Sequence, residues 1–150
     1  MALRRYRLVE RRYIVDYVMN RIKQRKSVIF NCPLGPTPES LRKMYPDLPP
    51  TYFRKWRRYA DAVVITTGSL LLIEAKIRDP IAGIGALINY KTLIPQTPEL
   101  KQYLHLQVVP ILVAPIERPD IKALCKANGI QFELYRPDWI IPYLKETGWL

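Results

Sequence analysis

The segment 59–76 constrains the fold of this chain more than any other part of the sequence. It contains two apolar runs, residues 63–66 and 70–73, which are rich in β-branched and aliphatic side chains and are separated by Thr67-Gly68. Apolar runs of this kind around a tight turn are typical of a β-hairpin. Both faces of the predicted hairpin are apolar, so we expect other elements to cover the sheet on both sides.

The predicted hairpin brings three charged residues together. With Thr67-Gly68 as the loop, Asp61 faces Glu74, whereas with Gly68-Ser69 as the loop Asp61 faces Lys76. In either register the period of two places Asp61, Glu74 and Lys76 on one face of the sheet. Two carboxylates this close on an apolar sheet repel each other unless a cation or a shared proton offsets their charge.

Carboxylate oxygens are suited to a hard divalent ion such as Mg²⁺ or Mn²⁺, which needs only one or two protein carboxylates. The ammonium group of Lys76 could then orient a water molecule for attack on a phosphodiester. The alternative is a hairpin whose end carries three solvated charges, with Glu74 and Lys76 as a weak ion pair.

The arrangement D-x12-E-x-K, with the acids at the ends of paired apolar strands, resembles the PD-(D/E)XK nuclease superfamily. This resemblance implies an α/β fold with a mixed central sheet flanked by helices, the restriction-endonuclease-like core. It also implies that Asp61 and Glu74 bind one or two Mg²⁺ ions, with the main-chain carbonyl of Ala75 completing the ligands, and that Lys76 positions the attacking water. The chain departs from the superfamily's name at Ala60, where that name has proline.

Residues 3–24 are predicted to form an amphipathic helix, because apolar side chains recur at intervals of three and four. Glu10 lies on or beside the apolar stripe, where an acid needs a partner. One interpretation is an intrahelical pair with Arg7 or Arg11. The resemblance implies a third acid of the metal site instead, since similar nucleases often bring a glutamate from the first helix.

Several basic residues are candidate phosphate contacts. Four of them lie on the predicted first helix and would flank the cleft that holds the predicted metal site: Arg4, Arg5, Arg11 and Arg12. Four more alternate with aromatic residues in the segment 52–59: Arg54, Lys55, Arg57 and Arg58. For this second group the alternative is a solvated face above a core that contains Phe53 and Trp56.

The rest of the chain predicts alternating strands and helices in a single domain over residues 1–150. A strand is expected near 26–32, followed by a proline-rich loop over 33–50 with at most one helical turn. Asp79-Pro80 predicts the start of a helix that runs to Leu93. On it, Lys91 is either a further phosphate contact or simply exposed to solvent. The remaining elements are predicted as a strand at 110–114, a helix at 119–127, a strand at 130–135 and helical turns in the tail.

Composition limits the classes of function. The net charge of +11 and pI near 9.8 favour a polyanionic partner. The chain has two cysteines and one histidine, which are too few ligands for a zinc site built from Cys and His. A serine or cysteine nucleophile would have to depend on that single histidine, so nucleophilic catalysis of this kind is not expected. No apolar stretch indicates a membrane span or a signal peptide, so we expect an intracellular protein, in the host cell if it is viral, that is not secreted. No nucleotide cofactor is expected.

The sequence therefore predicts a Mg²⁺-dependent DNA endonuclease, similar in layout to Holliday-junction resolvases among the superfamily's members. Resolution of a junction would also require a homodimer, because two strands are cut symmetrically. The alternative is a nucleic-acid-binding or assembly module that keeps the fold without cleaving. A peripheral protein of anionic membranes ranks last, because no basic amphipathic anchor is present apart from the predicted core helix.

Overall fold

The predicted hairpin forms the centre of the sheet. Its strands are β2 (Arg58–Ile65) and β3 (Ser69–Ala75), and they pair with Val63 opposite Leu72. At the turn the backbone N–H of Thr66 donates to the carbonyl of Ser69 at 3.0 Å. This is the register with Thr67-Gly68 as the loop.

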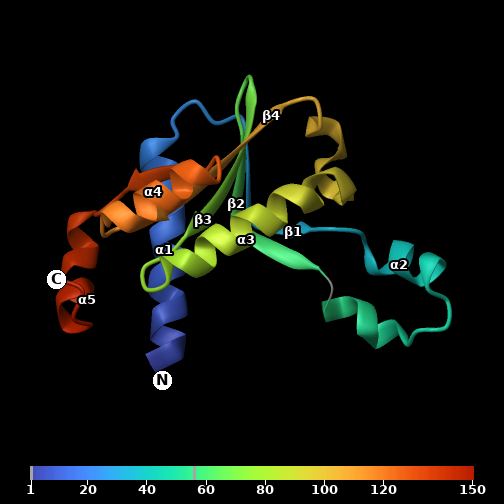
Figure 1. The fold of residues 1–150 in the computed structure, drawn as a ribbon, viewed down its shortest axis with the longest axis horizontal. Coiled ribbons are helices and arrows are strands. Elements are labelled where there is room, and N and C mark those ends of the chain that lie inside the picture. Colours follow the sequence, from blue (N-terminus) through green and yellow to red (C-terminus); the bar gives the residue numbers. More distant parts are fainter. Residues whose placement is uncertain (1, 56) are drawn as a thin grey trace.

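The computed structural model describes residues 2–55 and 57–150, and for residues 2, 3, 50, 54 and 55 it describes the backbone alone. Over these residues the chain forms one five-stranded mixed sheet in the order β1-β2-β3-β4-β5 (Figure 1). β1 (Ser27–Leu34) is antiparallel to β2, whereas β4 (Gln107–Ala114) and β5 (Gln131–Leu134) continue the sheet in parallel with β3. The predicted α/β class with a mixed sheet is confirmed.

Helices cover both faces of this sheet, as expected. α1 (Ala2–Arg21) packs on one face, and α3 (Pro80–Leu93) and α4 (Pro119–Ala127) pack on the other. The C-terminal elements, η4 (Asp138–Ile140) and α5 (Ile141–Glu146), add Ile140 and Leu144 to the cluster beneath α1. Asp79 caps α3 by accepting a hydrogen bond from the N–H of Ala82, with Pro80 following it in the first turn.

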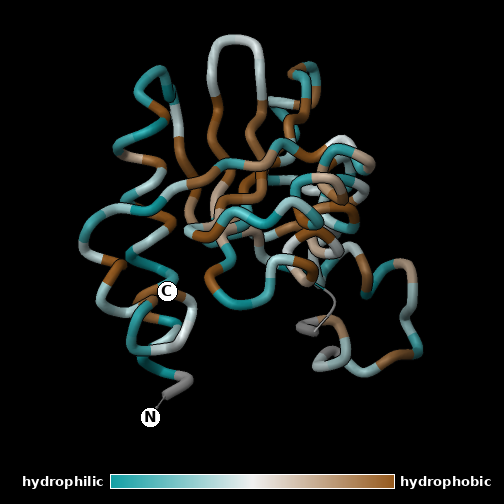
Figure 2. The backbone as a smooth tube through the Cα atoms, turned by 60° about the vertical axis from the view of Figure 1, so that its left-hand side comes forward, coloured by the Kyte–Doolittle hydropathy of each residue, from teal (hydrophilic) through white to brown (hydrophobic). Residues whose placement is uncertain are grey.

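The alternation along the hairpin divides the core into two layers. Val63, Leu70 and Leu72 belong to the cluster under α3, whereas Val64 and Ile73 belong to the cluster under α1. These strands are the apolar middle of the molecule in Figure 2. Burial on both faces explains why their sequence is continuously hydrophobic.

Several boundaries differ from the predictions. α1 ends at Arg21, three residues early, and β1 runs on to Leu34. Pro33 is tolerated within β1 because β1 is an edge strand, where a missing N–H costs no ladder hydrogen bond.

The segment 33–50, predicted as a loop with at most one helical turn, contains the seven-residue helix α2 (Pro38–Met44), and the 3-10 helix η1 (Pro50–Lys55) begins at the last residue of that segment. The side chain of Thr37 caps α2 by accepting from the N–H of Ser40, so the prolines flank the helix or start it. We call residues 36–55 the arm. The arm and the N-terminal end of α1 lie at the end of the molecule opposite the β2–β3 turn, as both views show (Figures 1 and 2).

Candidate active site

At one position along the paired strands β1 and β2, the regular alternation of side chains between the two faces of the sheet is interrupted. Ala62 packs under α1, but Ala60 packs under α3, although strict alternation would put both on one face. Across this point the described ladder pairs Phe30 with Ala62 and Cys32 with Ala60, and skips Asn31 and Asp61. Asn31 has a left-handed backbone with φ of 50°, which rotates β1 locally.

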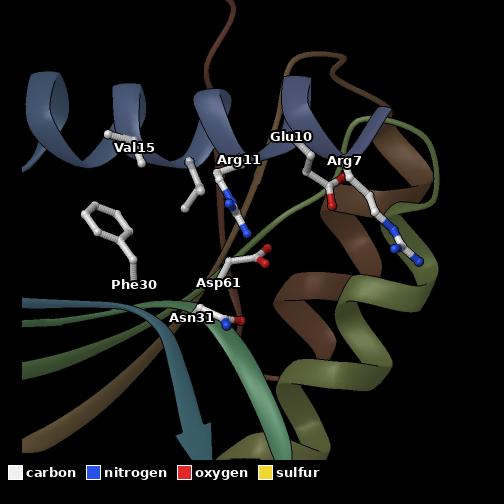
Figure 3. Close-up of a pocket in the computed structure, with 8 residues that line it drawn as sticks. Arg7, Glu10, Arg11, Val15, Phe30, Asn31 and Asp61 are labelled. Atoms are coloured by element: carbon white, nitrogen blue, oxygen red, sulfur yellow. The ribbon is translucent and has the colours of Figure 1, made fainter. Parts of the chain in front are cut away.

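This rotation directs Asp61 toward α1. Its side chain lines a pocket of about 370 Å³ together with Glu10 and Arg11 of α1 (Figure 3). The expectation that one face of the sheet carries all three motif residues therefore fails at Asp61, because alternation reverses there. Lys76 lies on the α3 side, beside Gly83 of that helix.

Asp61 and Glu74 are nevertheless held together by reciprocal hydrogen bonds. The backbone N–H of Asp61 donates to Oε1 of Glu74 at 2.9 Å, and the N–H of Ala75 donates to Oδ2 of Asp61 at 2.8 Å. Beyond the pair Ala62–Ile73 these side chains thus take the place of ladder hydrogen bonds between β2 and β3. One oxygen of each carboxyl is fixed in this way. Among the described residues, no hydrogen bond to the second oxygen of either carboxyl is found.

Burial makes both carboxyls hard to ionise. The side chain of Glu74 is only 3% exposed. Desolvation raises the pKa of Asp61 to about 6 and that of Glu74 to about 8, and repulsion from Asp61 is the second cause for Glu74. Tyr90 of α3 lies close enough to be affected, since burial first and then the charges of Glu74 and Asp61 raise its pKa to about 12.

Lys76 sits under the start of α3. A Cβ atom added at Gly83 would lie 2.7 Å from Cγ of Lys76 and 2.7 Å from Cδ1 of Leu112, so only glycine lets the helix pass this closely. The backbone N–H of Lys76 donates to the carbonyl of Val113 at 2.9 Å, which extends the hydrogen bonding between β3 and β4 to the residue after β3. The positive charge of Lys76 lowers the pKa of both Asp61 and Glu74, against the larger effect of burial.

Glu10 faces Asp61 across the pocket, as Figure 3 shows. Its negative charge contributes to the raised pKa of Asp61. The hydroxyl of Tyr6, one helical turn earlier, donates to Oε2 of Glu10, and the guanidinium of Arg78 lies 3.6 Å from the centre of the Tyr6 ring. The ion pairs found among the described residues do not include the expected pair of Glu10 with Arg7 or Arg11.

The predicted phosphate contacts on α1 divide into two groups. Arg5 makes a bidentate ion pair with Glu146 at 2.7 Å, and Arg12 stacks on the Trp139 ring at 3.9 Å, so both hold the C-terminal region. Arg11 lines the Asp61 pocket, and Arg4 is exposed. Only Arg11 of these four is placed at the candidate site.

The basic residues after the arm also differ from one another. Arg57 donates to both carboxylate oxygens of Glu99, at 2.8 and 2.7 Å, and to the carbonyl of Gly35, which gives it a structural role. Arg58 lines a second pocket of about 680 Å³ where the arm meets α3. Lys91 is exposed on α3. The side chains of Arg54 and Lys55, and all of Trp56, lie outside the described residues.

Sequence reasoning missed three residues that shape this site: Asn31, Tyr6 and Arg78. Tyr6 is one of the recurring side chains from which the amphipathic helix over residues 3–24 is predicted, and nothing near Arg78 in the sequence indicates a contact with it. For Asn31 a weak signal exists, since asparagine adopts left-handed backbone conformations more readily than most residues. Its position within an apolar strand conceals that signal.

No protein-family model matches the sequence, and a comparison with curated proteins finds no match. Among solved structures, one similar chain is a repair endonuclease from Pyrococcus abyssi, with 23% identity and a TM-score of 0.39, covering 53% of this chain and 33% of that one. Another is in an EndoMS-dsDNA2 complex, with 16% identity and a TM-score of 0.46, covering 83% of this chain and 43% of that one. The chain spans less than half the length of either. Both TM-scores are below 0.5, so the function of this chain is inferred from its own residues.

Proposed function

We propose that this protein is a metal-dependent DNA endonuclease that hydrolyses phosphodiester bonds, and that Asp61, Glu74 and Lys76 form its active site. The observation that carries this proposal is a pair of carboxyls, each hydrogen-bonded to the other's strand, of which Asp61 lines a pocket together with Arg7 and Arg11. Neither acid forms an ion pair among the described residues, and burial raises the pKa of both, so the fold holds them together against a clear electrostatic cost.

The donor set fits Mg²⁺ or Mn²⁺. Carboxylate oxygens of Asp61 and Glu74, with the carbonyl of Ala75, are hard ligands, and an ion would offset the repulsion that raises the pKa of Glu74. Within the described residues no cluster of three or more His, Cys, Asp or Glu side chains is arranged as a metal-ligand set, so water would complete the coordination. When bound, the ion would supply Lewis-acid activation of the phosphodiester and of a water molecule.

The chain's own groups would assist in defined ways. Lys76, held against Gly83, would orient the attacking water with its ammonium group. Glu10, oriented by the Tyr6 hydroxyl, would act as a third acid from the opposite wall of the pocket. The guanidinium of Arg11 would bind the phosphate and orient it for in-line attack by the water molecule.

DNA is the proposed partner, supported by the net charge of +11. A structure-selective substrate such as a four-way junction follows only from the resemblance in element order. A homodimer would be needed for symmetric cleavage of such a junction.

Among the described residues, no helix has the length and apolar character that crossing a membrane requires.

A non-catalytic DNA-binding module is the second candidate. One observation favours it: the raised pKa of Glu74 allows the acid pair to share a proton at neutral pH, which relieves repulsion without any metal.

A cleavage assay separates the two candidates. Linear, single-stranded, flap and four-way DNA would each be incubated with Mg²⁺ or with chelator. We expect Mg²⁺-dependent cleavage that falls by about 10²-fold or more in Asp61→Asn, Glu74→Gln and Lys76→Met, with DNA affinity retained. Asp120→Asn, which alters an exposed carboxylate on α4, is the matched control and should cleave normally. DNA binding without cleavage of any substrate, in either metal condition, would establish the binding module instead.

A further inference from the structure

The pocket beside Asp61 has an apolar half that the proposed phosphodiester chemistry does not use. Figure 3 shows Phe30 and Val15 facing each other at one end, while Asp61, Glu10 and Arg11 occupy the other. Ile14 also lines the pocket. A phosphate and its metal ion would fill only the charged end.

Phe30 lies on the edge strand β1 and is partly exposed to solvent. Phe30 and Val15 are both 38% exposed, although Ala62, the strand partner of Phe30, and Ile14, which precedes Val15 in α1, belong to the buried core. An aromatic face that lines a pocket and remains open to solvent is a surface on which a flat ring can stack.

Asn31 adds a polar edge to this surface. Among described residues other than glycine, it alone has a positive φ, and the skipped ladder pair leaves its side chain lining the pocket. No hydrogen bond found among the described residues uses its amide. An amide both donates and accepts, and asparagine makes such paired hydrogen bonds to the edges of nucleobases.

We propose that the apolar half of this pocket binds one unpaired nucleobase of the DNA, stacked on Phe30 with its edge at Asn31. This inference rests on the proposed function and narrows its substrate class. The pocket volume of about 370 Å³ falls within the range of sites that hold small ligands. A base inside an intact duplex would first have to be unstacked and unpaired, which costs free energy, so the favoured substrate is DNA with an unpaired nucleotide next to the cleaved phosphate.

The test measures binding in chelator, so that cleavage plays no part. Fluorescence anisotropy would compare a duplex carrying a single-nucleotide bulge with the same duplex fully paired. Stacking of one base on an aromatic side chain corresponds to roughly 5- to 150-fold in affinity, and we expect a preference for the bulge in this range. With 2-aminopurine as the bulged base, binding should also quench its fluorescence.

Variants of Phe30 assign the preference to the pocket. Phe30→Leu keeps an apolar side chain but loses the ring, and should abolish both the preference and the quenching while duplex affinity changes by less than about twofold. Phe30→Tyr keeps the ring and should retain them. Leu134→Ala, at an equally exposed apolar position on β5, is the control for surface truncation. Asn31→Gly keeps the left-handed backbone, removes the amide and should reduce the preference in part.

The outcomes distinguish this inference from the proposed nuclease activity. A wild-type protein without the preference, or a Phe30→Leu variant that keeps it, would overturn the pocket assignment even if Mg²⁺-dependent cleavage is found. Preference without cleavage would uphold the pocket and overturn the nuclease. Failure to bind any of these DNAs would overturn both.

Discussion

Asp61 and Glu74 are ionisable groups held where charge is least favourable. Desolvation is the largest cause of the raised pKa of each, and each carboxyl is also fixed by a backbone N–H that favours its charged form. The two sites interact strongly and therefore titrate as a pair. A bound cation would favour the doubly ionised form, so proton release and metal binding should be linked.

This linkage predicts how stability depends on pH. Because the folded pKa of Glu74, about 8, lies above its ordinary value of 4.5, the folded protein binds protons more tightly than the unfolded chain. The stabilising contribution of the protonated pair is complete below about pH 4 and is lost as pH rises through about 8. Without divalent metal, we expect the Tm of the wild type to fall across this window, and the Glu74→Gln variant to show a much weaker fall in thermal unfolding.

Two controls make this measurement specific. Glu39→Gln removes an exposed carboxylate on α2 and should leave the wild-type pH dependence in place. Adding Mg²⁺ should raise the Tm of the wild type at high pH more than at low pH, because the metal competes with protons. Identical pH profiles for the wild type and Glu74→Gln would contradict the raised pKa.

The position of the arm depends on the mostly buried guanidinium of Arg57. Arg57 is 12% exposed and bridges Glu99 of η3 (Pro98–Tyr103) and the carbonyl of Gly35. Its Nε atom has no partner among the described residues. Both ends of the arm are thus tied to the body of the protein through the same side chain.

Removing the partner of Arg57 should loosen the arm. In Glu99→Ala the guanidinium stays mostly buried without its carboxylate, and we expect the free energy of unfolding to fall by about 1–3 kcal/mol. Urea unfolding measures this change, and limited proteolysis should cut within residues 36–55 faster than in the wild type. Glu117→Ala removes the exposed pair with Lys122 and should cost less than about 0.5 kcal/mol. Equal losses in the two variants would refute an anchoring role for Arg57.

Local patterns predicted the elements whose causes are local. The hairpin register follows from a tight turn and alternating apolar residues, and α3 follows from its Asp-Pro start. The helix α2 was predicted as at most one turn although Thr37-Pro38 is a capping signal, because the surrounding prolines favoured a loop. The reversal at Asp61 depends on the backbone of Asn31 in another strand, and the pairing of Arg5 with Glu146 joins residues 141 positions apart. Neither arrangement produces a repeating pattern of residue types from which it could be predicted.

The helix α1 connects the candidate site to the C-terminal region of the protein. One side of the helix presents Glu10 and Arg11 to the pocket. Another side carries Asp16, whose carboxylate accepts hydrogen bonds from the Tyr135 hydroxyl at 2.6 Å and the Trp139 indole at 3.0 Å. The arginines of α1 therefore serve two purposes, and net charge alone does not tell them apart.

Salt dependence of DNA binding separates these purposes. Each phosphate contact to duplex DNA contributes about −0.9 to the slope of log affinity against log salt concentration. Arg11→Ala should reduce the steepness of that slope by about this amount and leave the Tm nearly unchanged, because Arg11 lines the open pocket. Arg12→Ala should leave the slope unchanged but lower the stability by about 0.5–1 kcal/mol, because its guanidinium stacks on Trp139.

The two variants remove the same charge from neighbouring positions of one helix, so each is the control for the other. A general effect of net charge would change both slopes equally, since long-range attraction depends little on a shift of one residue. A slope change in Arg12→Ala but not in Arg11→Ala would place DNA on the side of α1 that faces the C-terminal region and away from Asp61. Only a change confined to Arg11 is compatible with DNA that reaches the carboxyl pair.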